Sequence, residues 1–234
     1  MMNRTTPINS HSATGIALTA LATALLPFTG LAQFPDNHLP FRIGADQSGG
    51  NTYKGRIASV RLYKRAIKKD EVAFLAQRKP FDKAESPTPD HEWLLGQVKK
   101  DSCPANAGKL PAAVEGDVEE NNEGGVPCGE FSGGYLTVDD SETLDFSKGF
   151  TVDVWVRPET GIATCRIVDK ITPGGTDGFL LDIYPANTLR VIVGSEIITY
   201  QTDLDTEKWI HLAVTVKNTG TISLYVNGKL VEEN

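Results

Sequence analysis

Alternating acidic side chains are the first feature of this sequence that could do chemistry. Glycoside hydrolases work with two carboxyl groups, and retaining enzymes hold them about 5–5.5 Å apart. Asp203, Asp205 and Glu207 alternate, but they stand at a turn before a strand, where acids normally face solvent. The strand around Asp153 carries no second acid at period two. Motifs of serine hydrolases, zinc proteases, P-loop and dinucleotide-binding proteins are also missing from the sequence, so we expect no enzyme.

A second group of side chains could bind a ligand rather than transform it. On the strands that carry them, these residues lie on the face opposite the aliphatic side chains: Trp155, Trp209, His211 and Tyr225. Exposed aromatic rings mark recognition sites, so the four could form a platform for a carbohydrate. Alternatively they fill a second buried layer under long loops, with His211 as a hydrogen-bonded structural residue. Both interpretations stay open.

The three cysteines fit an exported protein with one disulfide bond and one free thiol. Cys103 and Cys128 lie in the same Gly/Pro/Asn-rich region, which favours a disulfide between them and leaves Cys165 as a spare thiol. The alternative is that all three are simply small buried residues. There is no Cys-x-x-Cys pair, so the sequence does not support a zinc knuckle or a thioredoxin-like site.

The strongest structural pattern lies between residues 208 and 231. Apolar side chains alternate from Ile210 to Val216 and again from Ile222 to Val226, which is the period of strands with one buried face. The sequence Asn218-Thr219-Gly220 predicts the first turn. Asn227-Gly228 predicts a type I′ turn, because both central positions need positive φ. Two consecutive antiparallel hairpins are therefore expected.

Short strands at regular spacing fill the rest of the chain. The expected strands cover residues 40–44, 55–64, 91–96, 131–138, 150–157, 166–170, 179–184, 189–193 and 197–202. One short amphipathic helix is expected over 68–77, and residues 101–129 read as a long irregular excursion. Such a pattern without long helices predicts an all-β, antiparallel sandwich.

Net charge and length restrict the possible functions. The 234 residues carry a formal charge of −7 and give a pI near 5.2. Binding to nucleic acid needs a basic surface, so we expect none. The length suits one β-sandwich with a short tail.

Residues 1–32 resemble a targeting segment rather than part of the fold. An apolar run over 14–26 is followed by the small residues Gly30 and Ala32, as in a cleaved signal peptide. A membrane anchor is the alternative, but the run is shorter than the roughly 20 residues of a spanning helix and Pro27 interrupts it. We therefore expect an exported protein, secreted or held in the periplasm or at the cell surface, with no membrane span.

A family resemblance adds to this interpretation. Trp209-x-His211-x-Ala213, the run 224–228 (LYVNG) and the run 150–158 (FTVDVWVRP) resemble the laminin-G-like, pentraxin-type jelly rolls of the concanavalin A-like group in secreted bacterial-type proteins. The resemblance implies an antiparallel jelly roll. It also implies a glycan or an extracellular protein as the partner.

The same resemblance implies a possible Ca²⁺ ion. It points to Asp46 and Asn51, which lie in a loop with two glycines, and Asp139 and Asp140 are a second candidate. Calcium takes six to eight oxygen ligands, which such loops can supply. The alternative is ordinary turn chemistry, since Asp and Asn often bind their own backbone.

The order of the segments departs from the family. Residues 34–78 resemble the closing strands and helix of such a sandwich, yet they precede a linker at 79–90 and the main body at 91–234. Three explanations remain. The domain is circularly permuted, the block is the remnant of an upstream repeat, or it closes a neighbour's sandwich in a swapped dimer.

The sequence thus predicts a secreted, non-catalytic recognition module that binds carbohydrate or an extracellular protein, with calcium as a possible aid. A glycoside hydrolase-like domain, or an accessory domain of a polysaccharide-degrading enzyme, is the first alternative. A structural protein of the envelope or matrix is the second.

Overall fold

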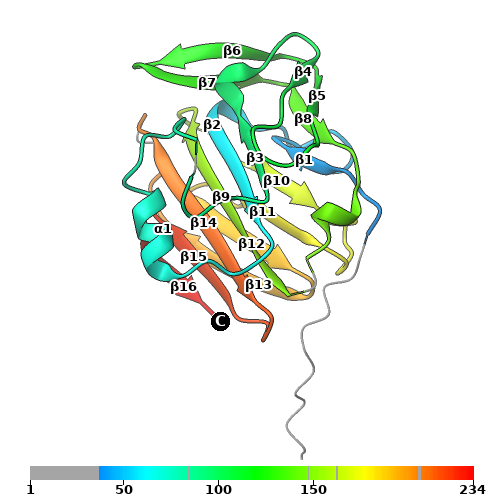
Figure 1. The fold of residues 1–234 in the computed structure, drawn as a ribbon, viewed down its shortest axis with the longest axis vertical. Coiled ribbons are helices and arrows are strands. Elements are labelled where there is room, and N and C mark those ends of the chain that lie inside the picture. Colours follow the sequence, from blue (N-terminus) through cyan, green and yellow to red (C-terminus); the bar gives the residue numbers. More distant parts are fainter. Residues whose placement is uncertain (1–36, 84, 147, 162, 205–206) are drawn as a thin grey trace, which may run out of the picture.

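The computed structural model describes residues 37–234 except 84, 147, 162 and 205–206. The expected signal peptide at 1–32 therefore lies outside the described residues, as does Asp205. Within the described part, two antiparallel sheets face each other across one core (Figure 1). The predicted all-β jelly-roll sandwich is confirmed.

The first layer, sheet A, has eight strands. Their order across the sheet is β13 (Glu196–Gln201), β12 (Thr188–Val193), β11 (Phe179–Ile183), β10 (Cys165–Lys170), β1 (Phe41–Ile43), β8 (Tyr135–Val138), β5 (Ala112–Glu115) and β4 (Ser102–Cys103). All the pairings are antiparallel.

Sheet B forms the second layer. It runs β16 (Lys229–Glu233), β15 (Ile222–Val226), β14 (Ile210–Lys217), β9 (Gly149–Pro158), β2 (Lys54–Tyr63), β7 (Val126–Ser132) and β6 (Val118–Glu123), and β3 (His91–Leu94) also pairs with β2. Two 3₁₀ turns, η1 (Leu95–Gln97) and η2 (Glu142–Leu144), and the helix α1 (Lys69–Leu75) complete the elements.

The core between the sheets is filled by the alternating apolar residues of both layers. Aromatic rings occupy one end, where Phe150 lies 4.7 Å from Phe179 and Phe41 lies 5.6 Å from Trp93 between ring centroids. Each such ring buries a large apolar area in a core. Both predicted C-terminal hairpins are present, and Asn227 and Gly228 have the positive φ values of 49° and 76° that the turn requires.

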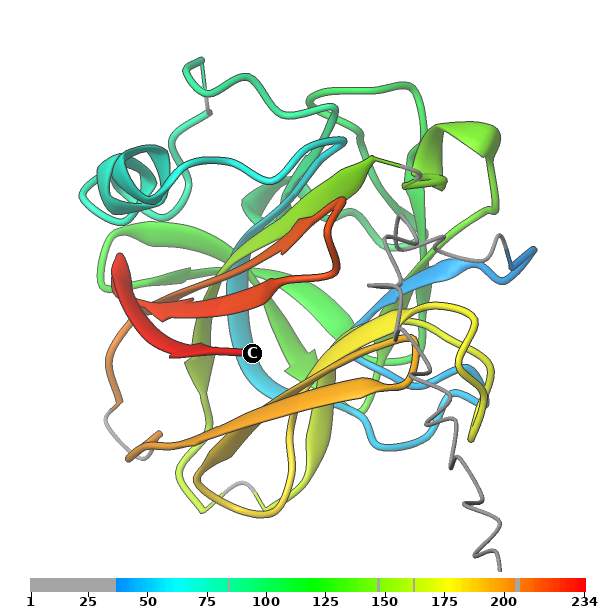
Figure 2. The same cartoon turned by 90° about the horizontal axis from the view of Figure 1, so that it is seen from below.

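The expectation that β14 has only one buried face is wrong. Its outward residues His211, Ala213 and Thr215 are buried as well as its core residues. Helix α1 covers this face (Figure 2). Its Val72 and Leu75 pack in one cluster with Ala213. The alternating pattern correctly assigned each side chain of β14 to one of the two faces of the strand. It could not predict that a further layer covers the outer face.

The expected irregular excursion at 101–129 is also wrong. It contains β4, β5, β6 and the start of β7, and β6 and β7 form a hairpin across one end of the sandwich (Figure 1). The hairpin turns at Gly124 and Gly125, both at positive φ. Strand β6 has the sequence VEENNE, and its acidic and amide side chains give no strand-like hydrophobic pattern. Its backbone nevertheless pairs with β7 along its whole length.

The amino-terminal block lies inside both sheets. Strand β1 pairs with β10 on one side and with β8 on the other, and β2 lies between β9 and β7. The segment 79–90 is not a fully exposed linker, because Pro87 and Pro89 are buried and the Pro80 carbonyl accepts a hydrogen bond from Ser59 Oγ at 2.7 Å. The circular permutation itself stays a prediction.

Candidate functional site

A groove of about 460 Å³ lies on the outer face of sheet A, away from the core. Strands β10, β11 and β12 form its floor, and the loops around Asp46 and at 171–176 form its rim. Its floor and edge include Arg166, Asp169, Leu180, Arg190, Ile192 and Ile197. A concave surface with mixed polar and apolar lining is the usual form of a binding site.

Strand alternation explains why these side chains face outward. Phe179, Leu181 and Ile183 of β11 point into the core, so Leu180 and Asp182 point to the opposite face. The register then places Asp182 directly opposite its ion-pair partners in both neighbouring strands. Local sequence and register together therefore bring this group to one place.

Asp182 organises two arginines of the groove. Its fully buried carboxylate accepts hydrogen bonds from Arg190 Nε at 3.0 Å and Nη2 at 2.7 Å, and it also binds Arg166 Nη1. This hydrogen bonding raises the pKa of Arg190 above its ordinary value. The Arg190 guanidinium stacks over the Tyr184 ring, 4.2 Å from its centroid, and Tyr184 is 48% exposed. The result is a fixed cation beside an accessible aromatic ring.

Asp169 ties the groove to the loop after β1. Its carboxylate accepts a hydrogen bond from Gln47 Nε2 at 2.9 Å and lies 3.0 Å from Arg166 Nε. Burial raises the pKa of Asp169, and the favourable contacts with Gln47 and Arg166 only partly oppose that rise. The same Gln47 amide donates to the carbonyls of Pro40 and Asp169, so the loop is held firmly against β10.

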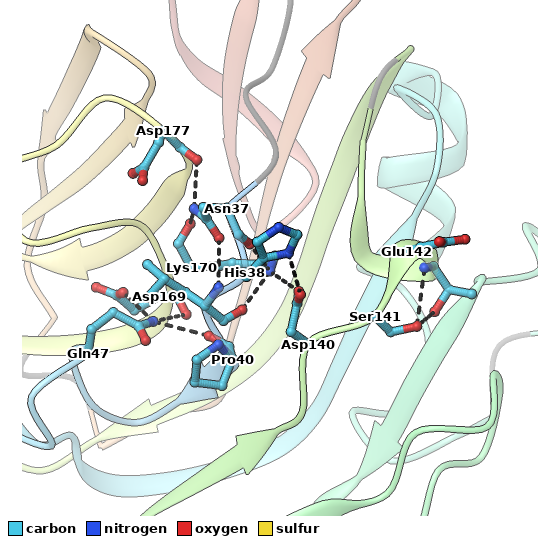
Figure 3. Close-up of polar contacts among 12 residues, drawn as sticks. Asn37, His38, Pro40, Gln47, Asp140, Ser141, Glu142, Asp169, Lys170 and Asp177 are labelled. Atoms are coloured by element: carbon cyan, nitrogen blue, oxygen red, sulfur yellow. Dashed lines mark hydrogen bonds and ion pairs between the residues drawn. The ribbon is translucent and has the colours of Figure 1, made fainter.

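The buried Lys170 fixes the chain next to this rim, as Figure 3 shows. Its ammonium donates to the carbonyls of Asn37 at 3.0 Å and Leu39 at 2.6 Å and pairs with Asp140 Oδ1 at 2.8 Å. Asp140 also lies 3.2 Å from His38 Nδ1. Asp140 is therefore engaged with basic groups, and the neighbouring Asp139 is exposed.

The loop proposed to bind calcium is closed by its own hydrogen bonds. The Asp46 carboxylate accepts from Ser48 N–H and Oγ, from Gly50 N–H and from the Asn51 amide at 2.7 Å. Burial alone would raise the pKa of Asp46, but these hydrogen bonds hold it below its usual value. The structure thus brings Asp46 and Asn51 together. Among the described residues, no group of three or more His, Cys, Asp or Glu side chains is arranged to hold a metal ion.

The aromatic candidates lie on the outer face of sheet B and are largely covered. His211 is fully buried, Trp155 and Tyr225 are 7% and 6% exposed, and Trp209 is half-buried. Tyr225 packs in the cluster beneath α1. A ligand could not reach the rings of Trp155, His211 and Tyr225 unless the covering segments moved. The aromatic candidates therefore do not form an open platform.

Beneath this cover lies a buried charge cluster of Arg61, Glu92, Asp153 and His211. Arg61 Nε lies 2.9 Å from Glu92 Oε1, and Nη1 lies 3.0 Å from Asp153 Oδ1. His211 Nε2 lies 2.5 Å from the other oxygen of Asp153, and Arg61 Nη2 also donates to the Asp82 carbonyl. The cluster therefore binds sheet B to the segment that covers it.

The predicted Cys103–Cys128 disulfide is wrong in this structure, since all three cysteines are free and buried. Cys103 lies in the main core at the edge of sheet A, whereas Cys128 lies on the outer face of sheet B against Ala58 and Trp155. Burial raises the pKa of the Cys128 thiol to about 11 and those of Cys103 and Cys165 to about 12. The interpretation as small buried residues describes them.

The fold and groove define a jelly-roll β-sandwich with a concave outer surface. Comparison with protein families agrees, because residues 130–234 match the family described as the concanavalin A-like lectin/glucanases superfamily. The resemblance expected from the sequence is confirmed over this part of the chain. None of the curated proteins compared with the chain matches it.

Two solved structures are similar over part of the chain. One is the binding domain of botulinum neurotoxin DC in complex with rat synaptotagmin II, with 18% identity, a TM-score of 0.46 and 59% of this chain covered. The other belongs to botulinum neurotoxin type C, whose cell entry depends on two ganglioside molecules, with 19% identity, a TM-score of 0.46 and 59% covered. The matches span only 38% and 37% of the length of those two chains.

Proposed function

We propose that this protein is a non-catalytic recognition module and that its ligand, a carbohydrate, binds in the groove on the outer face of sheet A. The observation that carries the proposal is the Arg190 guanidinium, held by buried Asp182 and stacked on the exposed Tyr184 ring. A pre-organised donor beside an accessible ring lowers the entropy that is lost on binding. The match of residues 130–234 to a superfamily that includes lectins supports the same class of function.

The chemistry of the groove suits a sugar. Arginine presents several N–H donors in a fixed plane, and the Ser48 hydroxyl adds a polar group at the rim. Exposed Ile197 at the edge of the groove, and exposed Tyr184 beside Arg190 outside the groove lining, supply apolar surface against which the C–H face of a sugar ring can pack. An extracellular protein is the other partner class that the sequence predicts.

Catalysis is the competing function because Asp46 and Asp169 both line the groove and their pKa values shift in opposite directions. Such a divergence is typical of acid and nucleophile pairs in glycoside hydrolases. However, the Asp46 carboxylate accepts four hydrogen bonds from its own loop, so it is poorly placed to attack a sugar carbon. We expect no release of reducing sugar from a bound polysaccharide, and loss of such activity in Asp169→Asn would establish the hydrolase instead.

Calcium assistance is part of the proposal only at Asp46 and Asn51. An ion there would have to displace the Asn51 amide and the Ser48 hydroxyl from the Asp46 carboxylate. Thermal unfolding in Ca²⁺ and in EDTA tests this. A higher melting temperature in Ca²⁺ that is lost in Asp46→Asn would support an ion in the loop, whereas equal melting temperatures would remove calcium from the proposal.

Export is likewise proposed from the sequence alone. The described residues contain no helix that is long and apolar enough to cross a membrane. The proposed site of removal after residue 32 is tested by sequencing the amino terminus of the protein recovered from its host. An amino terminus near residue 33 supports cleavage, and an intact leader in a membrane fraction supports the anchor.

Affinity electrophoresis through gels that contain single polysaccharides tests the ligand class. We expect retardation in at least one gel, with affinity reduced about tenfold or more in Arg190→Ala and Tyr184→Ala. Phe74→Ala, on exposed α1 surface, is the matched control and should bind as the parent does. If no polysaccharide is retained, a protein partner or a structural role takes the place of the carbohydrate.

A further inference from the structure

Each sheet of the sandwich ends in two edge strands. Sheet A ends at β13 and β4, and the main path of sheet B ends at β16 and β6; the short β3, which pairs with β2 beside that path, has its other side bound to residues 106–107. An edge strand presents a row of unpaired N–H and C=O groups to any other strand that approaches. Natural proteins block such rows with charged side chains, proline, bulges or very short strands.

Three of the four edges carry such protection. Strand β6 has three glutamates in six residues, and β16 begins with a lysine and ends with two glutamates. Strand β4 has only two residues. Pairing with another chain is therefore disfavoured along each of these edges.

Strand β13 is the least protected of these four edges. Its sequence is EIITYQ, so only the first residue is charged, and no proline is present. Its register with β12 runs without a bulge from Glu196 to Gln201. Ile197 is 57% exposed, and no described strand pairs with the outer side of β13. A regular strand that is rich in β-branched residues and carries its single charge at one end is a favourable template for another strand.

The strand is also compatible with a second copy of itself. Two edge strands that pair antiparallel around a two-fold axis keep the same faces of both sheets on one side. If the axis passes through Ile198, then Ile197 lies opposite Thr199 of the other copy, and Glu196 lies opposite Tyr200. If the axis passes through Thr199, Glu196 lies opposite Thr202. Glu196 faces no glutamate in either register, so like charges do not oppose the pairing.

We infer that β13 pairs antiparallel with β13 of a second copy of this chain, which joins the two A sheets into one continuous sheet. This contact differs from a swapped dimer, because each chain keeps its own β1 and β2. One strand pair is a small interface, so the dimer forms reversibly and depends on protein concentration.

The arrangement would also bring the two grooves onto one surface. Ile197 and Ser195 belong to the rim of the groove as well as to β13 or its preceding turn. Because the two-fold axis preserves the faces, both grooves would open on the same side and near each other. A repetitive ligand could then bind both sites, which raises its apparent affinity without new contacts. The dimer itself does not depend on the identity of that ligand.

Sedimentation equilibrium of the full chain over a roughly hundredfold range of concentration tests the inference. We expect the apparent mass to rise from one chain to two, and we expect Ile197→Lys to stay at one chain because an edge lysine opposes pairing. Leu230→Lys, at a 38% exposed position on the already charged β16, is the matched control and should dimerise as the parent does. Circular dichroism checks that both variants are folded.

Hydrogen exchange of the β13 amides is the second measurement. In the dimer, the outward amides between Ile197 and Gln201 exchange more slowly at high concentration than at low concentration, and those of β6 and β16 do not change. A chain that stays monomeric throughout would overturn the inference. Concentration-independent protection of β13 would also overturn it and would show that another part of the same chain covers the edge. A monomer that still binds polysaccharide would leave the proposed function intact.

Discussion

At the scale of single residues, the buried charge cluster of Arg61, Glu92, Asp153 and His211 is a feature with a large energetic consequence. Burial alone would raise the pKa of Asp153, but the adjacent His211 and Arg61 outweigh that effect and hold it below its usual value. Asp153 is thus ionised in the fold and joins β9 to β14 and to β2. Removing one member of such a buried group leaves the others without compensation.

We predict that Asp153→Asn lowers the free energy of unfolding at pH 7 by about 3–5 kcal/mol. Because the pKa of Asp153 is lower in the folded than in the unfolded chain, its contribution is complete above the unfolded value near 3.8 and disappears as the pH falls through the folded value. The variant should therefore lose part of the acid sensitivity of the parent. Urea titrations from pH 7 to pH 3 measure both effects.

The exposed Asp101 supplies the control, since Asp101→Asn should change neither the stability at pH 7 nor its acid slope. A stability at pH 7 that is unchanged in Asp153→Asn would contradict the interpretation of the cluster.

Residue positions could be predicted only in part from the sequence. The alternation correctly put Trp155, His211 and Tyr225 on the face away from the core. It could not reveal that α1 and the 79–90 segment cover that face, because this depends on contacts between distant parts of the chain. The partners Arg61 and Asp153 are 92 positions apart. The groove was missed, although charged residues at outward positions of three successive hairpin strands, Arg166, Asp182 and Arg190, were a usable signal.

At the scale of elements, helix α1 covers part of the outer face of sheet B. Its first turn is stabilised by Glu71, which accepts the Lys68 backbone N–H at 2.7 Å and pairs with Arg65 at 2.6 Å. These contacts, led by the hydrogen bond from Arg65, lower the pKa of Glu71 to about 2. The helix starts within one residue of the predicted position, although its N-cap residue is Lys68 rather than a Ser whose side chain could cap it. The Glu71 carboxylate instead accepts the backbone N–H of Lys68 and so stabilises the first turn.

We predict that Leu75→Ala destabilises the protein by about 2–5 kcal/mol, because Leu75 is fully buried between α1 and sheet B. Phe74→Ala, whose side chain is 49% exposed on the same helix, should change the stability by no more than about 0.5 kcal/mol. Thermal and urea unfolding of the two variants measure the contrast. Equal effects would mean that α1 does not pack on sheet B in solution.

Elements with clear alternation were predicted within one or two residues, as in β9 to β16. The failures share one cause. Strands such as β6 have no apolar alternation of their own and are held by hydrogen bonds to a partner strand, which the local sequence does not encode.

At the scale of the whole molecule, the sandwich cannot be divided after residue 80. Without β1, sheet A would lose the strand between β10 and β8, and without β2 the sheet B strands β9 and β7 would have no common neighbour. Each gap would expose two new unpaired edges.

We predict that residues 33–234 unfold in one cooperative transition and that residues 81–234 do not form a stable fold or aggregate. Thermal unfolding with measurement of mass in solution compares the two proteins. Identical melting curves would show that the amino-terminal block is not part of the sandwich, which would favour the remnant of a repeat over the permuted domain.

The central position of β1 and β2 also determines the order in which the protein can fold. The ribosome completes β1 and β2 well before it makes β8, β9 and β10, which pair with them, so β1 has no partner strand until β8 is made and β2 has only β3 and β7 before β9 is made. Pairings over such long stretches of sequence slow folding, because the entropy of closing the loop is lost before the contacts form. Refolding of this sandwich should therefore be limited by the arrival of β1 and β2 beside β8, β9 and β10, and the amino-terminal strands are enclosed on both sides only when β10 is present.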